Sequence, residues 1–223
     1  MSELHTVRQP RGAPRLRLLS AAAAVAGLAV GVAIAFLHRP AAPAGAPGPS
    51  GAADLTWPAG ARRAPGFRLE DAFGRPVALA ALRGKPVLLT FIDPLCRNFC
   101  PLEAQQLDRV LRSFPPASRP AVVAVSVNVY GNARSNLMLD NRKWHLPREW
   151  HWAVGSGAEL ARVWHRYEIG VRVSTQTIGG VTVHEVAHTE AAYLVDRHGF
   201  ERALFMWPFT AAAVERSLRG LAS

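Results

Sequence analysis

The stretch PVLLTFIDPLCRNFCP, residues 86–101, decides the fold. Its first half, residues 86–92, is almost entirely apolar, as expected for a central strand that is covered on both faces. A short turn follows, and then Cys96 and Cys100, after which residues 102–114 show apolar side chains at helical spacing. We therefore expect a strand, a turn and a helix whose N-terminus carries both cysteines.

Further elements are expected on both sides of this unit. In chain order they are a hairpin of residues 67–69 and 77–79, a buried strand over 121–129, a helix over 158–167 with Leu160, Ala161 and Trp164 inward, strands over 191–195 and 202–205 joined around Gly199, and a helix over 211–221. This order predicts an α/β fold, a thioredoxin-like three-layer sandwich with an N-terminal β-hairpin extension.

The chain has 223 residues and a formal charge of +10, and its basic residues are nearly all arginines. Clustered arginines would suggest binding to nucleic acid, because they follow phosphates. Beyond the N-terminal group, however, these arginines are scattered and often adjoin apolar residues, which is typical of solvated helix faces. We expect no nucleic-acid partner.

Residues 18–37 form a run of 20 residues without charge, long enough at about 1.5 Å per residue to cross the hydrocarbon core. Four arginines precede this run, which puts the N-terminus in the cytoplasm and everything after it outside. The predicted organisation is a basic cytoplasmic tail over 1–17, a single transmembrane anchor over 18–37 in the cytoplasmic membrane, a Pro/Ala/Gly linker over 38–65 and a folded domain over 66–223. Cleavage near Ala42, Ala44 and Ala46 is the alternative.

Cys96 and Cys100 are the only cysteines of the chain. A helix N-terminus stabilises a thiolate, and Arg97 could add to this effect. A plain structural disulfide would stabilise only modestly, because it closes a very small loop. The C-x-x-x-C spacing leans toward a metal clamp without excluding a reversible redox pair, and thiolates with one imidazole suit copper, Cu(I) in particular.

His184-Glu185-x-x-His188 matches the pattern of zinc proteases, which requires a helix that puts both histidines on one face. Two glycines precede it, and the neighbouring residues are mostly β-branched, which favours an extended chain. The sequence therefore argues against a zinc protease. One of the two histidines could still bind a metal ion.

Several motifs together resemble the Sco/SenC family over about residues 65–220. They are Gly66-Phe67-Arg68-Leu69, Gly74-Arg75-Pro76-Val77, residues 82–91, Cys96-x-x-x-Cys100-Pro101, Ala124-Val125-Ser126-Val127, and His188-Thr189 ahead of Tyr193-Leu194-Val195-Asp196-Arg197-His198-Gly199. The resemblance implies a membrane-tethered thioredoxin-like domain that binds one copper ion through Cys96, Cys100 and His188. It also implies a metallochaperone role in assembling the dinuclear copper centre of cytochrome c oxidase subunit II, which would be the partner.

Two positions depart from the family pattern. The cysteine loop contains Arg97-Asn98-Phe99 where the family usually has Pro-Asp, and Asn128 stands where family members commonly carry an aspartate. By the resemblance, His184 is either a group near the metal site or simply an exposed side chain, and His188 lies on a loop leading into a strand.

Other readings remain open. An exported thiol-disulfide oxidoreductase would use Cys96 and Cys100 as its catalytic redox pair, and a peroxiredoxin-like peroxidase is a more distant possibility. The aromatic and histidine-rich patch of residues 144–152 could dock a partner or hold a second metal, but a packed or half-exposed loop is the simpler interpretation. That patch comprises Trp144, His145, Trp150, His151 and Trp152.

Overall fold

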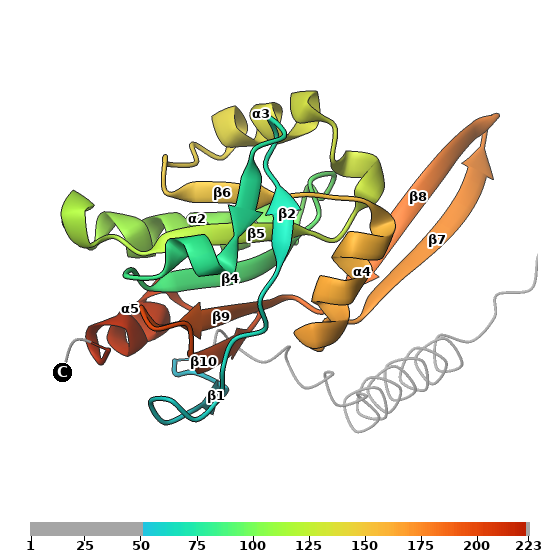
Figure 1. Cartoon of the computed structure of the whole chain (residues 1–223). Helices are drawn as coiled ribbons and strands as arrows, with labels where there is room; N and C mark the ends of the chain where they lie inside the picture. The colour runs from blue at the N-terminus through green and yellow to red at the C-terminus, as the bar shows by residue number, and fades with distance from the viewer. Residues whose placement is uncertain (1–50, 222–223) are drawn as a thin grey trace, which may run out of the picture. The chain divides into compact units, whose positions relative to one another are not determined.

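A six-stranded mixed sheet forms the centre of the computed structural model, which describes residues 51–221 (Figure 1). The order of strands across the sheet is β1-β10-β9-β4-β5-β6. Their bounds are β1 Leu55–Thr56, β4 Val87–Ile92, β5 Ala121–Ser126, β6 Trp150–Ala153, β9 Ala191–Val195 and β10 Glu201–Met206. Strands β4, β5 and β6 run parallel, whereas β9, β10 and β1 are each antiparallel to their neighbours.

Helices cover both faces of this sheet and make the three layers that the sequence predicts. The helices are α2 Phe99–Arg112, α3 Arg134–Lys143, α4 Gly157–Arg166 and α5 Ala211–Arg219. Alternate residues of β4 point to opposite faces: Leu88 packs in the core beneath α2 and α5, and Leu89 packs in the core beneath α4. The parallel β4-α2-β5 unit and the closing β9-β10-α5 unit are thereby confirmed.

The expected N-terminal hairpin is confirmed as β2 Arg68–Glu70 and β3 Pro76–Ala78, paired antiparallel. Leu69 and Val77 are its buried residues, and they join the core on the α4 side. The turn between the strands contains Gly74 at a φ of 75°, a backbone conformation that glycine adopts without strain.

A second hairpin, β7 Val171–Ile178 and β8 Val181–His188, projects from the sheet (Figure 1). Gly179 and Gly180 form its two-residue turn, and both have positive φ, as tight hairpin turns require. The sequence predicts an extended chain here but neither the hairpin nor its pairing. Most residues of both strands are exposed, so the sequence has no row of apolar residues that would predict these two strands.

The folded part begins earlier than residue 66, contrary to the expected linker over 38–65. Strand β1 pairs with β10, and Ala64 is buried. Composition misses this because two exposed residues can join a sheet edge through backbone hydrogen bonds alone. A smaller correction concerns α4, where Val163 is buried and Ala161 is exposed.

The predicted anchor over residues 18–37 lies outside the described residues. Within residues 51–221, every helix is too short or too polar to cross a lipid bilayer.

An ion pair ties residue 62 to the sheet. Arg62 Nε lies 2.6 Å from Oε2 of Glu201, whose side chain is completely buried at the start of β10. We expect Arg62→Met to lower the free energy of unfolding by about 2 kcal/mol, because it leaves a buried carboxylate without its cation. This is less than the roughly 3–5 kcal/mol for fully buried pairs, since Arg62 keeps contact with water.

Urea unfolding of the variant measures this loss. Arg63→Met is the matched control, because Arg63 contacts the ring of Phe200 and no described carboxylate. Equal stabilities of the two variants would show that residue 62 is not anchored as described.

Candidate metal centre

The two cysteines lie where β4 ends and α2 begins, as the sequence predicts. Asp93 stabilises the turn between β4 and α2. Its carboxylate accepts the Leu95 N–H at 2.7 Å, and its backbone oxygen accepts the Cys96 N–H at 3.0 Å. Asn98 then caps α2 by accepting the Phe99 N–H at 2.9 Å. Cys96 therefore sits just before the helix, and Cys100 lies in its first turn.

The Cys96 side chain is half-buried, and while it carries its proton its Sγ donates to Oδ1 of Asn98 at 2.9 Å. Its Sγ accepts the backbone N–H of Cys100 at 3.4 Å, as expected at a helix N-terminus. The Cys100 thiol, as a hydrogen-bond donor, is the largest cause that lowers the pKa of Cys96, which falls to about 5 against the opposing effect of burial. Cys96 is thus ionised at neutral pH and is both a nucleophile and a soft metal ligand.

Cys100 differs from Cys96 in both burial and pKa. It is 1% exposed, and its hydrogen bond to Cys96 and its burial both raise the pKa of its thiol far above the usual range. Both cysteines are free in this structure. The pair is therefore asymmetric: Cys96 is an accessible thiolate and Cys100 is a buried, protonated thiol. Cys100 ionises only when a metal ion or an electrophile replaces its proton.

His188 reaches the cysteines from the end of β8. The sequence predicts a loop here, but His188 is the last residue of β8, because it pairs with Val171 of β7. The His188 side chain is 5% exposed, and this burial lowers its pKa, so the imidazole is neutral at neutral pH. Nδ1 lies 3.0 Å from the backbone oxygen of Thr189, which can only accept, so Nδ1 carries the proton and Nε2 keeps a free lone pair.

The turn after β4, the start of α2, the end of β8 and the segment before β9 meet around one cavity of about 640 Å³, which Cys96, His188 and Glu190 line. Residues 51–221 contain a single group of three or more potential metal donors. It consists of one atom each of Cys100, His188 and Glu190, and these atoms all lie within 4.8 Å of one another. Cys96 is not in that tight group but faces the same cavity. Glu190 is not predicted from the sequence, where its only signal is its position two residues after His188.

The donor chemistry fits a soft metal ion. Two sulfurs and a neutral imidazole nitrogen with a free lone pair are the ligands that copper prefers, Cu(I) above all. The proton on Nδ1 is held by a backbone carbonyl, which fixes the ring in the orientation that presents Nε2. The three predicted ligand residues are therefore compatible with one metal site.

His184 does not join this site. It lies on β8 opposite Thr175, and its ring stacks on Tyr130 with centroids 3.7 Å apart. Four residues along a strand span about 13 Å, so His184 and His188 cannot hold one zinc ion. The zinc-protease pattern is thus excluded, as the sequence indicates.

The two departures from the family pattern have local explanations. Arg97 is directed to backbone oxygens, with Nη1 3.0 Å from Pro94 O and 2.8 Å from Cys96 O, and its nearest carboxylate is that of Asp140 at 3.5 Å. Asn128 donates from its amide to the Asp93 carboxylate at 2.9 Å. An aspartate there could not donate this bond when ionised.

The patch of residues 144–152 is mostly core. Trp144, Trp150 and Trp152 are buried, and the ring of Trp152 contacts the other two. Trp150 and Trp152 belong to strand β6 rather than to the expected loop. His145 is exposed, and burial lowers the pKa of His151. Neither histidine belongs to a metal-donor group among the described residues.

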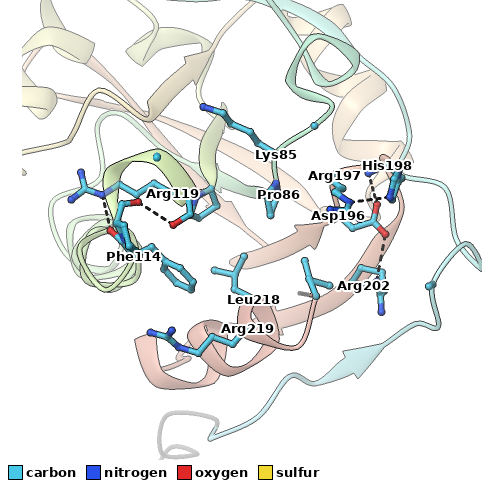
Figure 2. A pocket seen from close by; sticks show the side chains of 17 residues that line it. Lys85, Pro86, Phe114, Arg119, Asp196, Arg197, His198, Arg202, Leu218 and Arg219 are labelled. Carbon is cyan, nitrogen blue, oxygen red and sulfur yellow. Dashed lines mark hydrogen bonds and ion pairs between the residues drawn. The ribbon is translucent and has the colours of Figure 1, made fainter. Parts of the chain in front are cut away.

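A second, larger cavity of about 870 Å³ lies at the other end of the sheet (Figure 2). Lys85 and Pro86, which lead into β4, line it together with Arg119, ahead of β5, whereas the cysteines follow the opposite end of β4. This cavity therefore takes no part in the cysteine and histidine site.

We expect alkylation of Cys96 by iodoacetamide to be nearly independent of pH above neutrality and to fall to half its maximum at about pH 5, the pKa of this thiol. Cys100→Ala should move that midpoint upward, because it removes the thiol that donates to the thiolate. Alkylation rates measured across pH report this midpoint.

Cys96→Ala is the control and should react slowly, since only the buried Cys100 remains. A midpoint near the ordinary thiol pKa of about 8.5 in the unaltered chain would contradict the asymmetric pair.

Solved structures share this fold. Copper-bound ScoI of Bradyrhizobium japonicum matches with a TM-score of 0.62 and 22% identity, covering 71% of this chain and 99% of that chain. Copper-bound yeast Sco1 matches with a TM-score of 0.63 and 15% identity, covering 72% of this chain and 88% of that chain.

BsSco, a Sco-family cytochrome c oxidase assembly protein with an identified disulfide switch, matches with a TM-score of 0.57 and 16% identity, covering 77% of this chain and 98% of that chain. Comparison with curated protein sequences gives no match. The model of the SCO1/SenC family matches residues 58–223, which is far more than half of the sequence. The chain therefore belongs to the SCO1/SenC family.

Proposed function

We propose that this protein is a copper metallochaperone that binds one copper ion through Cys96, Cys100 and His188. The observation that carries the proposal is that Cys96 and the buried, neutral imidazole of His188 line one cavity, while the sulfur of Cys100 lies within 4.8 Å of a donor atom of His188. Family membership supports it, because relatives of the same fold have been solved with copper bound.

The protonation states suit reversible copper binding. Cys96 is already a thiolate and His188 is already neutral, so only Cys100 has to release a proton when the ion enters. Three soft donors hold Cu(I) in a site that still opens to the surface through Cys96. The copper ion is thus cargo that an incoming acceptor can reach.

The acceptor that we propose is the dinuclear copper centre of cytochrome c oxidase subunit II. This rests on the family and on BsSco, which is a member of the Sco family of cytochrome c oxidase assembly proteins. We further propose that residues 18–37 tether the domain to the cytoplasmic membrane on its extracytoplasmic side, as their length and flanking arginines suggest.

A thiol-disulfide oxidoreductase is the second candidate, and the asymmetric cysteine pair favours it. The Cys96 thiolate would attack one sulfur of a substrate disulfide, forming a mixed disulfide as the other substrate sulfur leaves as a thiolate. Cys100 would then lose its proton and attack the Cys96 sulfur. This step releases the second substrate thiolate, so two electrons pass to the substrate and a Cys96–Cys100 disulfide remains.

His188→Ala tests the copper proposal. We expect one Cu(I) per chain in the reduced parent under anaerobic conditions, and an affinity at least about tenfold lower in the variant, because one of three ligands is gone. Competition with a chromophoric Cu(I) chelator measures this affinity. His184→Ala is the matched control on the same strand and should bind like the parent; equal affinities of all three proteins would remove His188 from the ligand set.

Cys100→Ser tests the oxidoreductase. The variant should accumulate a mixed disulfide between Cys96 and its substrate in cells, since the resolving thiol is missing. Non-reducing gels of the tagged full chain would detect this adduct. Cys96→Ser is the control without the attacking thiolate, and a Cys100→Ser pattern identical to this control would reject the second candidate.

A further inference from the structure

Glu190 occupies a fixed position beside the proposed copper ligands. It lies between His188, at the end of β8, and Ala191, at the start of β9. Its backbone oxygen accepts the Trp207 N–H at 3.0 Å, which anchors the segment to the residues after β10. The Glu190 side chain is only 20% exposed and lines the cavity that Cys96 and His188 also line.

The Glu190 carboxylate is within reach of a shared metal ion. Donor atoms of Cys100, His188 and Glu190 all lie within 4.8 Å of one another, and Glu190 Oε1 is 4.0 Å from His188 Nε2. Two donors bound to one ion at roughly 2.0–2.3 Å lie about 3–4 Å apart. Side-chain movements of about an ångström therefore bring all three donors to bonding distance.

No described arginine or lysine pairs with Glu190 within 4.0 Å, so a salt bridge does not account for this partly buried carboxylate. Asp93 lines the same cavity, but its Oδ1 already accepts from the Leu95 N–H and the Asn128 amide. Glu190 is thus the acidic side chain of this cavity whose oxygens remain available to an ion.

We propose that Glu190 is a fourth metal ligand, an oxygen donor that adds a binding mode for divalent ions, divalent copper included, to the three-donor mode for Cu(I). This inference rests on the copper site proposed above and extends it.

The ligand preferences of the two kinds of ion explain why Glu190 would bind divalent ions but not Cu(I). Two thiolates and an imidazole satisfy Cu(I), which gains little from a hard carboxylate oxygen. A divalent ion accepts nitrogen and oxygen donors readily and commonly takes four ligands. Two thiolates and one carboxylate also carry three negative charges, which a divalent ion neutralises better than a monovalent one.

Glu190→Gln in the full chain, reduced and anaerobic, tests the proposal with two probes. Co²⁺ is a divalent probe that leaves thiols reduced and reports its coordination through visible absorption bands, and Cu(I) is the monovalent probe. We expect Co²⁺ affinity to fall at least about tenfold and the cobalt ligand-field bands to change, while the thiolate-to-cobalt charge-transfer band persists. Cu(I) affinity should stay within about twofold of the parent.

Glu185→Gln is the matched control. It removes the same charge from β8, where Glu185 is exposed and accepts from Gln176 at 3.1 Å. This variant should match the parent with both ions, which separates a direct bond from a general change in charge.

Three outcomes would overturn the inference. Unchanged Co²⁺ affinity and spectrum in Glu190→Gln would show that Glu190 is not a ligand, and the copper site would stand if His188→Ala still lost Cu(I). Equal losses of both ions would show that Glu190 only supports the local structure. A parent chain that binds neither ion would reject the proposed copper site and this inference with it.

Discussion

The antiparallel pairing of β4 with β9 is the constraint on which the site depends. Its register, from Val87 opposite Val195 to Thr90 opposite Ala192, sets the carboxyl end of one strand beside the amino end of the other. The first end leads to the cysteines and the second follows the segment of His188 and Glu190. A one-residue slip would turn the buried side chains of β9 to the wrong face and carry the histidine away from the sulfurs.

Much of this architecture could be predicted from local sequence. The apolar runs of β4 and β5 mark strands covered on both faces, and the spacing in α2 and α5 marks amphipathic helices. The position of Cys96 follows from the same pattern, because it lies in the short turn between the predicted strand and the predicted helix. The role of His188 as a metal ligand is predicted only from the family resemblance, because no local sequence signal distinguishes it.

The remaining features depend on contacts that local sequence does not encode. Glu190 joins the site only through the pairing of strands about one hundred residues apart. Most residues of strands β7 and β8 are exposed, so these strands lack the sustained apolar alternation that predicts a strand. Helix α3 buries just Leu137 and Asp140, too few residues for a visible stripe, and β1 is held by backbone bonds that any composition can make.

The cysteine pair would link metal binding to redox chemistry, because copper bound as proposed and a Cys96–Cys100 disulfide would compete for the same two sulfurs. X-ray absorption at the copper edge of the Cu(I)-loaded protein tests the central claim most directly. The account predicts two sulfur scatterers from Cys96 and Cys100 and one nitrogen from His188, with the nitrogen lost in the protein that lacks this imidazole. A copper ion bound by nitrogen and oxygen alone, or by a single sulfur, would contradict it.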